Sequence, residues 1–408
     1  MTGMVPLKRL ARIRYGLGQP PPAADVGVPI LRATNINRGR ISSANLMRSR
    51  LVDLPLDRAP LLVAGEILVV RSGAYTGDSA RVPEEWAGSA PGYDLRVTPE
   101  FADSRYLAYS VLGSAALDQM ALVSTRAAQP HLNAEELGEV GICVPALEEQ
   151  RRIVDFLDAE TGRLDSIITL RAKQVELLRS GEGSLLERLL PQVNSVRTRV
   201  KYLSTRITSG PRGWGELVSD EGSLFVRITN IPRRGVRLDL RDSLYVAAPT
   251  GLERERSRIK LGDVLLSITA DIGSVAIADE RAVDGNISQH VAMVRPSGEV
   301  DPQWLAYAIK SSRSNQALRM NSYGGTKVGL GLGDVADLAV DAPDLRTQRA
   351  VATRIDLAIA QRTELSSQMQ RQLELLKERR QALITAAVTG QFDVSTASGR
   401  NVADGVTV

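Results

Sequence analysis

The sequence predicts a mixed α/β fold in which two similar globular domains alternate with two long helices. The main observation is an internal repeat, because the Leu-Ala-Tyr triplet at residues 107–109 recurs 198 residues later at 305–307. The second observation is that a long amphipathic helical pattern follows each copy. A repeat of this length far exceeds a solenoid unit of roughly 20–50 residues, and each copy can bury its own core. We therefore expect a pseudo-twofold pair of domains.

The first domain is predicted to cover residues 1–145. Short β-rich runs such as 29–32 and 67–70 lie between turns of Gly and Pro. Apolar residues at helical spacing predict a helix over 104–122. An apolar strand at 140–144 then closes the domain.

The first long helix is predicted within residues 146–196. Its apolar positions between 147 and 190 are spaced by three, four or seven residues, which is typical of a helix that packs along another helix. Gly181 and Gly183 weaken the helix and predict a break near 181–184.

The second half of the chain repeats this organisation. A second domain is expected over residues 197–343, with strands at 223–231 and 264–269 and a helix at 302–320. A second long helix is expected over 344–394, followed by a disordered tail at 395–408. Each apolar stripe is too long for a small domain to bury, so antiparallel packing of the two helices is favoured over two separate partner-binding helices. Such packing would hold the two domains at a fixed distance.

Composition limits the class of protein only modestly. The chain is 43% apolar and 24% charged, which is ordinary for a globular protein. Its net charge of +4 permits a polyanionic partner but argues only weakly for one. Cys143 is the only cysteine, which excludes internal disulfides and multi-cysteine zinc sites. With no signal-peptide core and no apolar run near the ~20 residues that span a bilayer, we expect a soluble intracellular protein without a membrane partner.

A family resemblance rests on the ends of the predicted helices. The segment Pro-Ala-Leu-Glu-Glu-Gln-Arg-Arg-Ile-Val at residues 145–154 resembles the start of a conserved helix in the specificity subunits of Type I restriction-modification enzymes. Residues 343–355 are a looser copy of it, and residues 375–390 resemble the end of the family's C-terminal helix. The resemblance covers about residues 5–394, and the order, duplication and spacing of the motifs make it specific.

The resemblance implies a DNA-binding subunit that is not itself a catalyst. Each target recognition domain would read one half of a bipartite double-stranded DNA sequence, and the helices would set the unread spacer. The expected partners are two DNA methyltransferase subunits and motor/endonuclease subunits in the cytoplasm. S-adenosylmethionine, ATP and Mg²⁺ would be bound by those partners and not by this chain. The subunit-docking candidates are Gln150, Arg151, Gln348 and Arg349.

Missing motifs argue against catalysis by the chain itself. The sequence lacks an Asn-Pro-Pro-aromatic methyltransferase motif, a phosphate-binding Gly-x4-Gly-Lys-Ser/Thr loop and any Glu-x-Lys nuclease triplet. His131 and His290, the only histidines, are expected to be surface or core residues and not catalytic or metal-binding ones. Two alternatives stay open: a two-domain scaffold that binds protein or RNA, and a self-contained DNA methyltransferase or nuclease.

The candidate DNA-reading residues lie in three loops of each domain. Arg and Lys suit guanine edges and phosphates, and Asn or Gln suits adenine. The Thr-Asn-Ile triplet is repeated, and a turn role for its asparagine is at least as well favoured as DNA contact. The first-domain candidates are Arg32, Asn35, Asn37, Arg38, Arg40, Arg71, Ser72, Tyr75, Arg126 and Gln129. The second-domain candidates are Arg227, Asn230, Arg233, Arg234, Arg237, Thr269, Thr326 and Lys327.

Overall fold

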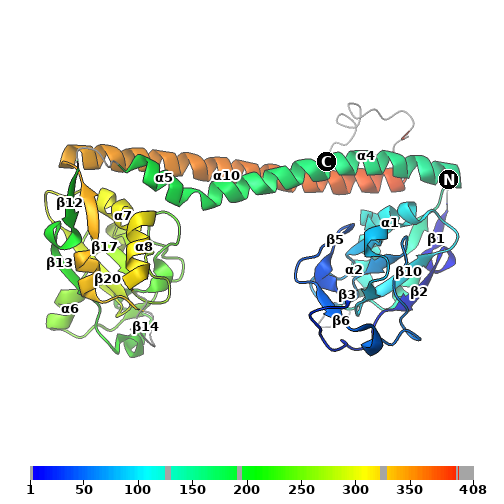
Figure 1. Ribbon diagram of the computed structural model, residues 1–408, viewed down its shortest axis with the longest axis horizontal. Helices are drawn as coiled ribbons and strands as arrows, with labels where there is room; N and C mark the ends of the chain where they lie inside the picture. The colour runs from blue at the N-terminus through cyan, green and yellow to red at the C-terminus, as the bar shows by residue number, and fades with distance from the viewer. Residues whose placement is uncertain (1–2, 125–129, 191–194, 322–328, 392–393, 395–408) are drawn as a thin grey trace. The chain divides into compact units, whose positions relative to one another are not determined.

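The computed structural model describes residues 3–124, 130–190, 195–321, 329–391 and 394. The chain divides into two compact units, one formed by Met1–Ala172 with Arg371–Val408 and the other by Lys173–Gln370. Each unit joins one globular domain to segments of both long helices (Figure 1).

The first domain is built on a four-stranded antiparallel sheet. Its strands lie in the order β2 (Ala11–Tyr15), β10 (Leu95–Pro99), β7 (Ile67–Val69) and β8 (Ser79–Arg81). Smaller sheets pair β1 (Met4–Pro6) with β11 (Gly141–Cys143), β3 (Val28–Leu31) with β6 (Met47–Ser49) and β9 (Ala90–Pro91), and β4 (Ile36–Asn37) with β5 (Arg40–Ile41). The short 3-10 helices are η1 (Leu7–Arg9), η2 (Ala33–Asn35), η3 (Leu51–Asp53) and η4 (Glu84–Trp86).

Three helices pack against the first domain's sheets: α1 (Ser104–Leu112), α2 (Ser114–Ser124) and α3 (Ala134–Gly138). The prediction of one continuous helix over 104–122 is wrong, because the backbone at Gly113 is extended and ends α1. A Cβ at Gly113 would lie only 3.0 Å from Cγ2 of Val388, so the glycine also lets this corner approach the C-terminal helix closely.

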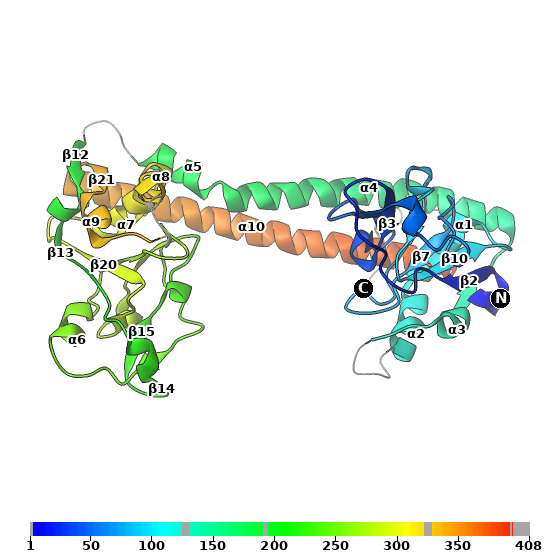
Figure 2. The ribbon, with the colours of Figure 1, turned by 60° about the horizontal axis from the view of Figure 1, so that its bottom comes forward.

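The second domain repeats the first domain's strand order, which confirms the internal repeat. Figure 2 labels β13, β15 and β20 of this domain. Its central sheet has the order β13 (Ser204–Ser209), β20 (Val291–Pro296), β17 (Val264–Ser267) and β18 (Val275–Ile277). The smaller sheets contain β12 (Val196–Arg199) with β21 (Ala339–Ala342), and β14 (Val218–Ser219), β16 (Tyr245–Val246), β15 (Ser223–Val226) and β19 (Asn286–Ile287). The helices are α6 (Leu252–Ser257), α7 (Pro302–Lys310), α8 (Ser312–Asn321) and α9 (Leu332–Asp337), with 3-10 turns η5 (Val200–Tyr202), η6 (Trp214–Leu217), η7 (Ile228–Asn230) and η8 (Glu280–Ala282).

Two of the secondary-structure elements predicted for this domain end earlier or are divided in the structure. The predicted strand at 223–231 ends at Val226, because residues 228–230 form a 3-10 turn. The predicted helix at 302–320 is divided between α7 and α8 at Ser311, the counterpart of the break at Gly113.

The long helices are α4 (Leu147–Ser180), α5 (Glu182–Leu189) and α10 (Leu345–Val388). The predicted break near 181–184 is confirmed at Gly181. A Cβ at Gly181 would lie 2.4 Å from Nη2 of Arg362, and that nitrogen donates a hydrogen bond to the Leu178 carbonyl at 2.9 Å. The glycine therefore makes room for an arginine that satisfies a helix-end carbonyl.

The two long helices pack antiparallel, as predicted. In the first unit the start of α4 (residues 153–157) shares an apolar cluster with the end of α10 (residues 383–388). Farther along, Arg380 of α10 forms an ion pair with Asp165 of α4 at 2.9 Å. In the second unit Leu186 of α5 packs in one cluster with Ile355 of α10. The alternative of two helices without mutual contact is therefore wrong.

Among the described residues no single helix is long and apolar enough to cross a membrane, and α1 with α2 meets that criterion only as a pair bent by 60°. The predicted tail at 395–408 lies outside the described residues.

Candidate nucleic-acid interface

The repeated glutamines join each domain to the long helix that follows it. Gln150 is 3% exposed, accepts a hydrogen bond from the Asp103 backbone N–H at 2.9 Å and donates one to the Pro145 carbonyl at 2.9 Å. Gln348 makes the same bonds to Asp301 and Pro343. The docking assignment of both glutamines is therefore corrected, because neither reaches the surface.

Replacing Gln150 by Ala should loosen the first domain from α4. The substitution leaves the Asp103 N–H without its buried acceptor and opens a small cavity, at a cost of about 1–3 kcal/mol. Urea unfolding of the full chain measures this effect. The exposed neighbour variant Arg151→Ala is the control and should change stability by less than about 0.5 kcal/mol. Equal effects of the two variants would contradict the assigned role of Gln150.

The repeated tyrosines provide a second attachment between domain and helix. The Tyr109 hydroxyl donates to Asp158 of α4 at 2.8 Å, and the Tyr307 hydroxyl bonds Asp356 of α10. Burial raises the pKa of Tyr109 to about 12, so the hydroxyl stays a donor over the physiological range. The Leu-Ala-Tyr repeat is therefore explained by attachment of each domain to its helix.

The repeated asparagines form turns and do not face solvent. Asn35 is fully buried, and its amide nitrogen donates to the carbonyls of Ser42 and Ala44 at 3.0 and 2.9 Å. Asn230 likewise donates to two backbone carbonyls of its own loop. We correct the inclusion of Asn35 and Asn230 among the DNA-reading residues, because their amide groups are already used by the backbone.

The arginines that precede these turns also support the loop. Arg32 donates to the Asn45 carbonyl at 2.7 Å, and Arg227 donates to Asp242 at 2.9 Å through its carbonyl and 3.0 Å through its carboxylate. Arg32 stays exposed, whereas Arg227 is half-buried. Each domain thus places one arginine in the same supporting position.

The other cations of the first loop pair differ in how freely they can reach a ligand. Arg40 forms an ion pair with Asp165 at 2.6 Å, which it shares with Arg380, so it contributes to the attachment of the domain to the helices. Arg38 lies 3.6 Å from Asp78, and Arg233 lies 3.1 Å from Asp271. Three further candidates of these loops are exposed side chains: Asn37, Arg234 and Arg237.

The second loop of the first domain holds Arg71 in a stack. Its guanidinium lies 4.8 Å from the ring centre of Tyr15 and 4.3 Å from that of Tyr93, and Nη2 is 2.9 Å from Nε2 of His131. Ser72 is half-buried beside it and Tyr75 is 54% exposed. The two rings hold the Arg71 guanidinium in one place. The side chain would therefore lose little conformational freedom on binding a ligand.

The structure gives fewer contacts for the remaining candidates. Thr269 is half-buried, and its backbone bridges to Gly329. The third-loop candidates Arg126, Gln129, Thr326 and Lys327 lie outside the described residues. Within the described ranges, no group of three or more His, Cys, Asp or Glu side chains could hold a metal ion.

Both domains contain a pocket in the same place. Both include the connection after the first sheet strand (β2 or β13), the turn that begins at Arg32 or Arg227, and the connection that leads into β10 or β20. The first pocket is lined in addition by Met47 and Ser72. The first-domain pocket has a volume of about 220 Å³ and is lined by Leu17, Gln19, Pro20, Ile30, Arg32, Met47, Ser72, Tyr93 and Asp94, among others. The second-domain pocket has a volume of about 420 Å³ and includes Pro211, Trp214, Glu216, Phe225, Arg227, Ile228, Ser288, Gln289 and His290.

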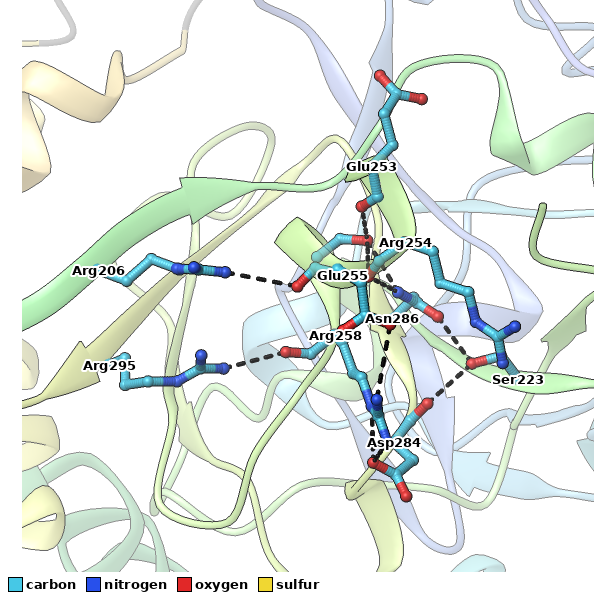
Figure 3. Close-up of polar contacts among 10 residues, drawn as sticks. Arg206, Ser223, Glu253, Arg254, Glu255, Arg258, Asp284, Asn286 and Arg295 are labelled. Carbon is cyan, nitrogen blue, oxygen red and sulfur yellow. Dashed lines mark hydrogen bonds and ion pairs between the residues drawn. The ribbon is translucent and has the colours of Figure 1, made fainter. Parts of the chain in front are cut away.

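A polar network around Asn286 lies close in sequence to the second pocket's lining (Figure 3). The buried Asn286 of β19 donates to the Arg254 carbonyl at 2.9 Å and the Ser257 hydroxyl at 2.8 Å, and accepts from the Ser223 hydroxyl at 2.8 Å. These bonds connect β19 to α6 and β15, two residues before Ser288 enters the pocket. The network therefore fixes the end of β19 by contacts between segments that are distant in the sequence.

Asp94 is the most unusual group in the first-domain pocket. It is 2% exposed; one carboxylate oxygen accepts from the Arg71 N–H at 3.2 Å, and the other, Oδ2, has no partner. Burial raises the pKa of Asp94 to about 6, against the opposing effect of Arg71. Sequence reasoning missed Asp94 and Tyr93, because a lone Tyr-Asp pair before a strand gives no signal of its own.

The stability of the first domain should therefore depend on pH through Asp94. Its pKa is higher in the folded than in the unfolded chain, so its contribution to stability is present below about pH 4 and is lost as pH rises through about 6. Asparagine does not titrate, so the Asp94→Asn variant does not lose this contribution. The free energy of unfolding of the variant minus that of the unsubstituted protein should therefore increase by about 2–3 kcal/mol between pH 4 and pH 8. Urea unfolding at both pH values measures this, with exposed Asp118→Asn as the control. A pH-independent difference would disprove the raised pKa.

Comparison with known proteins agrees with this architecture. Residues 25–177 match the family described as the Type I restriction modification DNA specificity domain. The specificity subunit of the Type I restriction enzyme EcoBI from Escherichia coli is 20% identical over 289 residues, which are 64% of this chain and 60% of that protein. The StySPI specificity subunit from Salmonella potsdam is 22% identical over 178 residues, 42% of this chain and 37% of that protein. The chain thus spans less than two thirds of either relative's length.

Solved structures share the whole fold. A chain from a study of complex assembly and conformational transition of the type I R-M system aligns with a TM-score of 0.74 at 19% identity, over 95% of this chain and 98% of that chain. The HsdS subunit from Thermoanaerobacter tengcongensis aligns with a TM-score of 0.54 at 19% identity, over 95% and 97% of the two chains. The architecture is that of a two-domain, two-helix protein. The predicted resemblance to Type I specificity subunits is confirmed by the domain match over residues 25–177 and by the similarity to the EcoBI and StySPI specificity subunits.

Proposed function

We propose that the chain is the DNA specificity subunit of a Type I restriction-modification complex. Recognition domains 1–145 and 197–343 each read one half of a bipartite double-stranded DNA target. Helices 146–196 and 344–394 set the unread spacer and dock two DNA methyltransferase subunits. The exposed Arg151 and Arg349, at matching positions of the two helices, are the docking candidates that this proposal retains.

One observation carries the proposal: the same fold occurs twice, with the same supporting contacts and different side chains at the equivalent loops. Arg32 and Arg227 support their loops alike, whereas the second loop offers Arg71 in one domain and Thr269 in the other. Two domains of the same fold that expose different loop side chains are suited to a DNA target whose two halves differ in sequence.

The chemistry belongs to the partner subunits in this proposal. The methyltransferase subunits use S-adenosylmethionine, and the motor/endonuclease subunits use ATP and Mg²⁺, in the cytoplasm. The chain contributes recognition and geometry and no catalytic group.

Methylation mapping tests the proposal. Cells that express the chain with its cognate methyltransferase should carry methylated adenines in a single bipartite motif, and cells that lack the chain should not. The purified chain with S-adenosylmethionine should methylate nothing. Methylation by the purified chain would favour the self-contained enzyme, and filter binding that prefers RNA to duplex DNA would favour the scaffold.

A further inference from the structure

The two equivalent pockets suggest how each domain makes its choice of base. Resting on the proposed function, we propose that each pocket holds one unstacked base of the half-site that its domain reads. In the first domain Asp94 selects a base that presents an amino group, adenine or cytosine. In the second domain Arg227 and Ser288 select a base that presents an acceptor edge.

The walls of both pockets suit the flat faces of a base. Leu17, Ile30 and Met47 line the first pocket, and Trp214 and Phe225 line the second. Apolar and aromatic walls with a few polar groups at the end are the usual construction of sites that hold extruded bases. Pockets of these sizes can take one heterocycle but cannot admit a helix or a strand of a protein partner.

The polar atoms of the two pockets are complementary to different base edges. In the first pocket Oδ2 of Asp94 is a buried acceptor without a donor. In the second, Nε of Arg227 is a buried donor without an acceptor, and the Ser288 hydroxyl also has no partner. Buried polar atoms without partners cost stability, so a ligand that supplies the missing bonds gains that energy on binding.

A fixed cation stands beside the first pocket. Arg71 is stacked between Tyr15 and Tyr93, and Tyr93 and Ser72, the residue next to Arg71, both line the pocket. A guanidinium held in this way can bind the phosphate of the nucleotide whose base enters the pocket. Tyr93 is 47% exposed, so its ring is also accessible for stacking by a neighbouring base.

The first test compares methylated motifs in cells that express variants of the full chain with the cognate methyltransferase. Asp94→Asn should change the base accepted at one position of the first domain's half-site and leave the second half-site unchanged. His290→Asn, in the corresponding connection of the second domain, is the matched control and should affect only the other half-site. The readout is the ratio of methylation at sites that carry the original base to methylation at sites that carry a different base at that position of the first half-site. Asp94→Asn should shift this ratio at least tenfold.

The second test places 2-aminopurine next to each position of the mapped first half-site in turn, in duplexes bound by the assembled complex, so that the base at the tested position keeps its own amino group. Fluorescence should rise at one position besides the adenine that the methyltransferase extrudes. Asp94→Asn, checked for folding by circular dichroism, should abolish that additional rise. An unchanged motif for a folded Asp94→Asn complex, or no additional unstacked position, would overturn the proposal. A wild-type complex without any bipartite motif would instead refute the proposed function.

Discussion

Replacing residues 1–143 by the same domain of a relative is expected to change one half of the methylated motif and to leave the other half intact. The physical reason is that the first domain closes on itself. Strand β1 pairs with β11 in the register Met4 with Cys143, so a junction after residue 143 leaves every sheet of the domain complete. The side chains that line its pocket all come from residues 17–94.

The attachment of the domain to the helices limits which relatives can be used. The Ser114 N–H donates to Thr385 at 2.9 Å, and Gln381 donates to the Leu112 carbonyl at 2.6 Å. The incoming domain must therefore keep the α1–α2 corner, together with the tyrosine that bonds Asp158. A swap that keeps these contacts is expected to change the recognition domain without changing its attachment to the long helices.

Methylation mapping of the swapped complex is the measurement, and the reciprocal exchange of residues 196–342 is its control. That segment is closed in the same way, by the pairing of Val196 with Ala342. Each exchange should alter a different half of the motif. Alteration of both halves, or of neither, by one exchange would refute independent reading by two domains.

The sequence alone predicted the fold well because its repeat and its helical stripes are local patterns. The break at Gly181 and the antiparallel helices followed from glycine positions and apolar spacing. The break at Gly113 did not, because the apolar spacing continues across it; the close approach of Val388, 275 residues away in the chain, also gives no local signal.

The candidate site was predicted only in part, for a related reason. Arg32 and Arg71 were found because they lie in polar loops beside repeated motifs. Asp94 and Trp214 were missed because the first pocket is assembled from five separate segments of the chain and the second from three. The repeated Asn35 had the strongest sequence signal in its loop, and that signal reports a turn.

Gly-Glu-Ile-Leu at residues 65–68 and Gly-Asp-Val-Leu at residues 262–265 are equivalent segments of the two domains, and the acidic residue of each forms a buried or largely buried ion pair. Glu66 is 3% exposed and receives Arg96 through Nε at 3.1 Å and Nη2 at 2.7 Å; it also accepts from the Thr98 hydroxyl at 2.7 Å. In the second domain Asp263 receives Arg295 at 2.8 and 2.7 Å. The acid joins the start of β7 or β17 to the neighbouring strand β10 or β20.

Glu66→Ala is therefore expected to destabilise the full chain by about 3–5 kcal/mol, because it leaves Arg96 buried without its counter-charge. The Pro60 carbonyl, at 2.7 Å from Nη1, can satisfy only part of that guanidinium. Urea unfolding followed by circular dichroism measures the loss. The control is Glu139→Ala, which removes the exposed ion pair with Lys8 and should cost less than about 1 kcal/mol.

A double variant separates loss of the pair from loss of packing. Glu66→Met with Arg96→Met removes both charges and keeps apolar volume, so it should recover most of the stability that Glu66→Ala loses. If Glu66→Ala cost no more than Glu139→Ala, the buried pair would not be what fixes β7 against β10. If the double variant were no more stable than the single one, the loss would come from the Thr98 hydrogen bond and from packing, and not from the unpaired arginine.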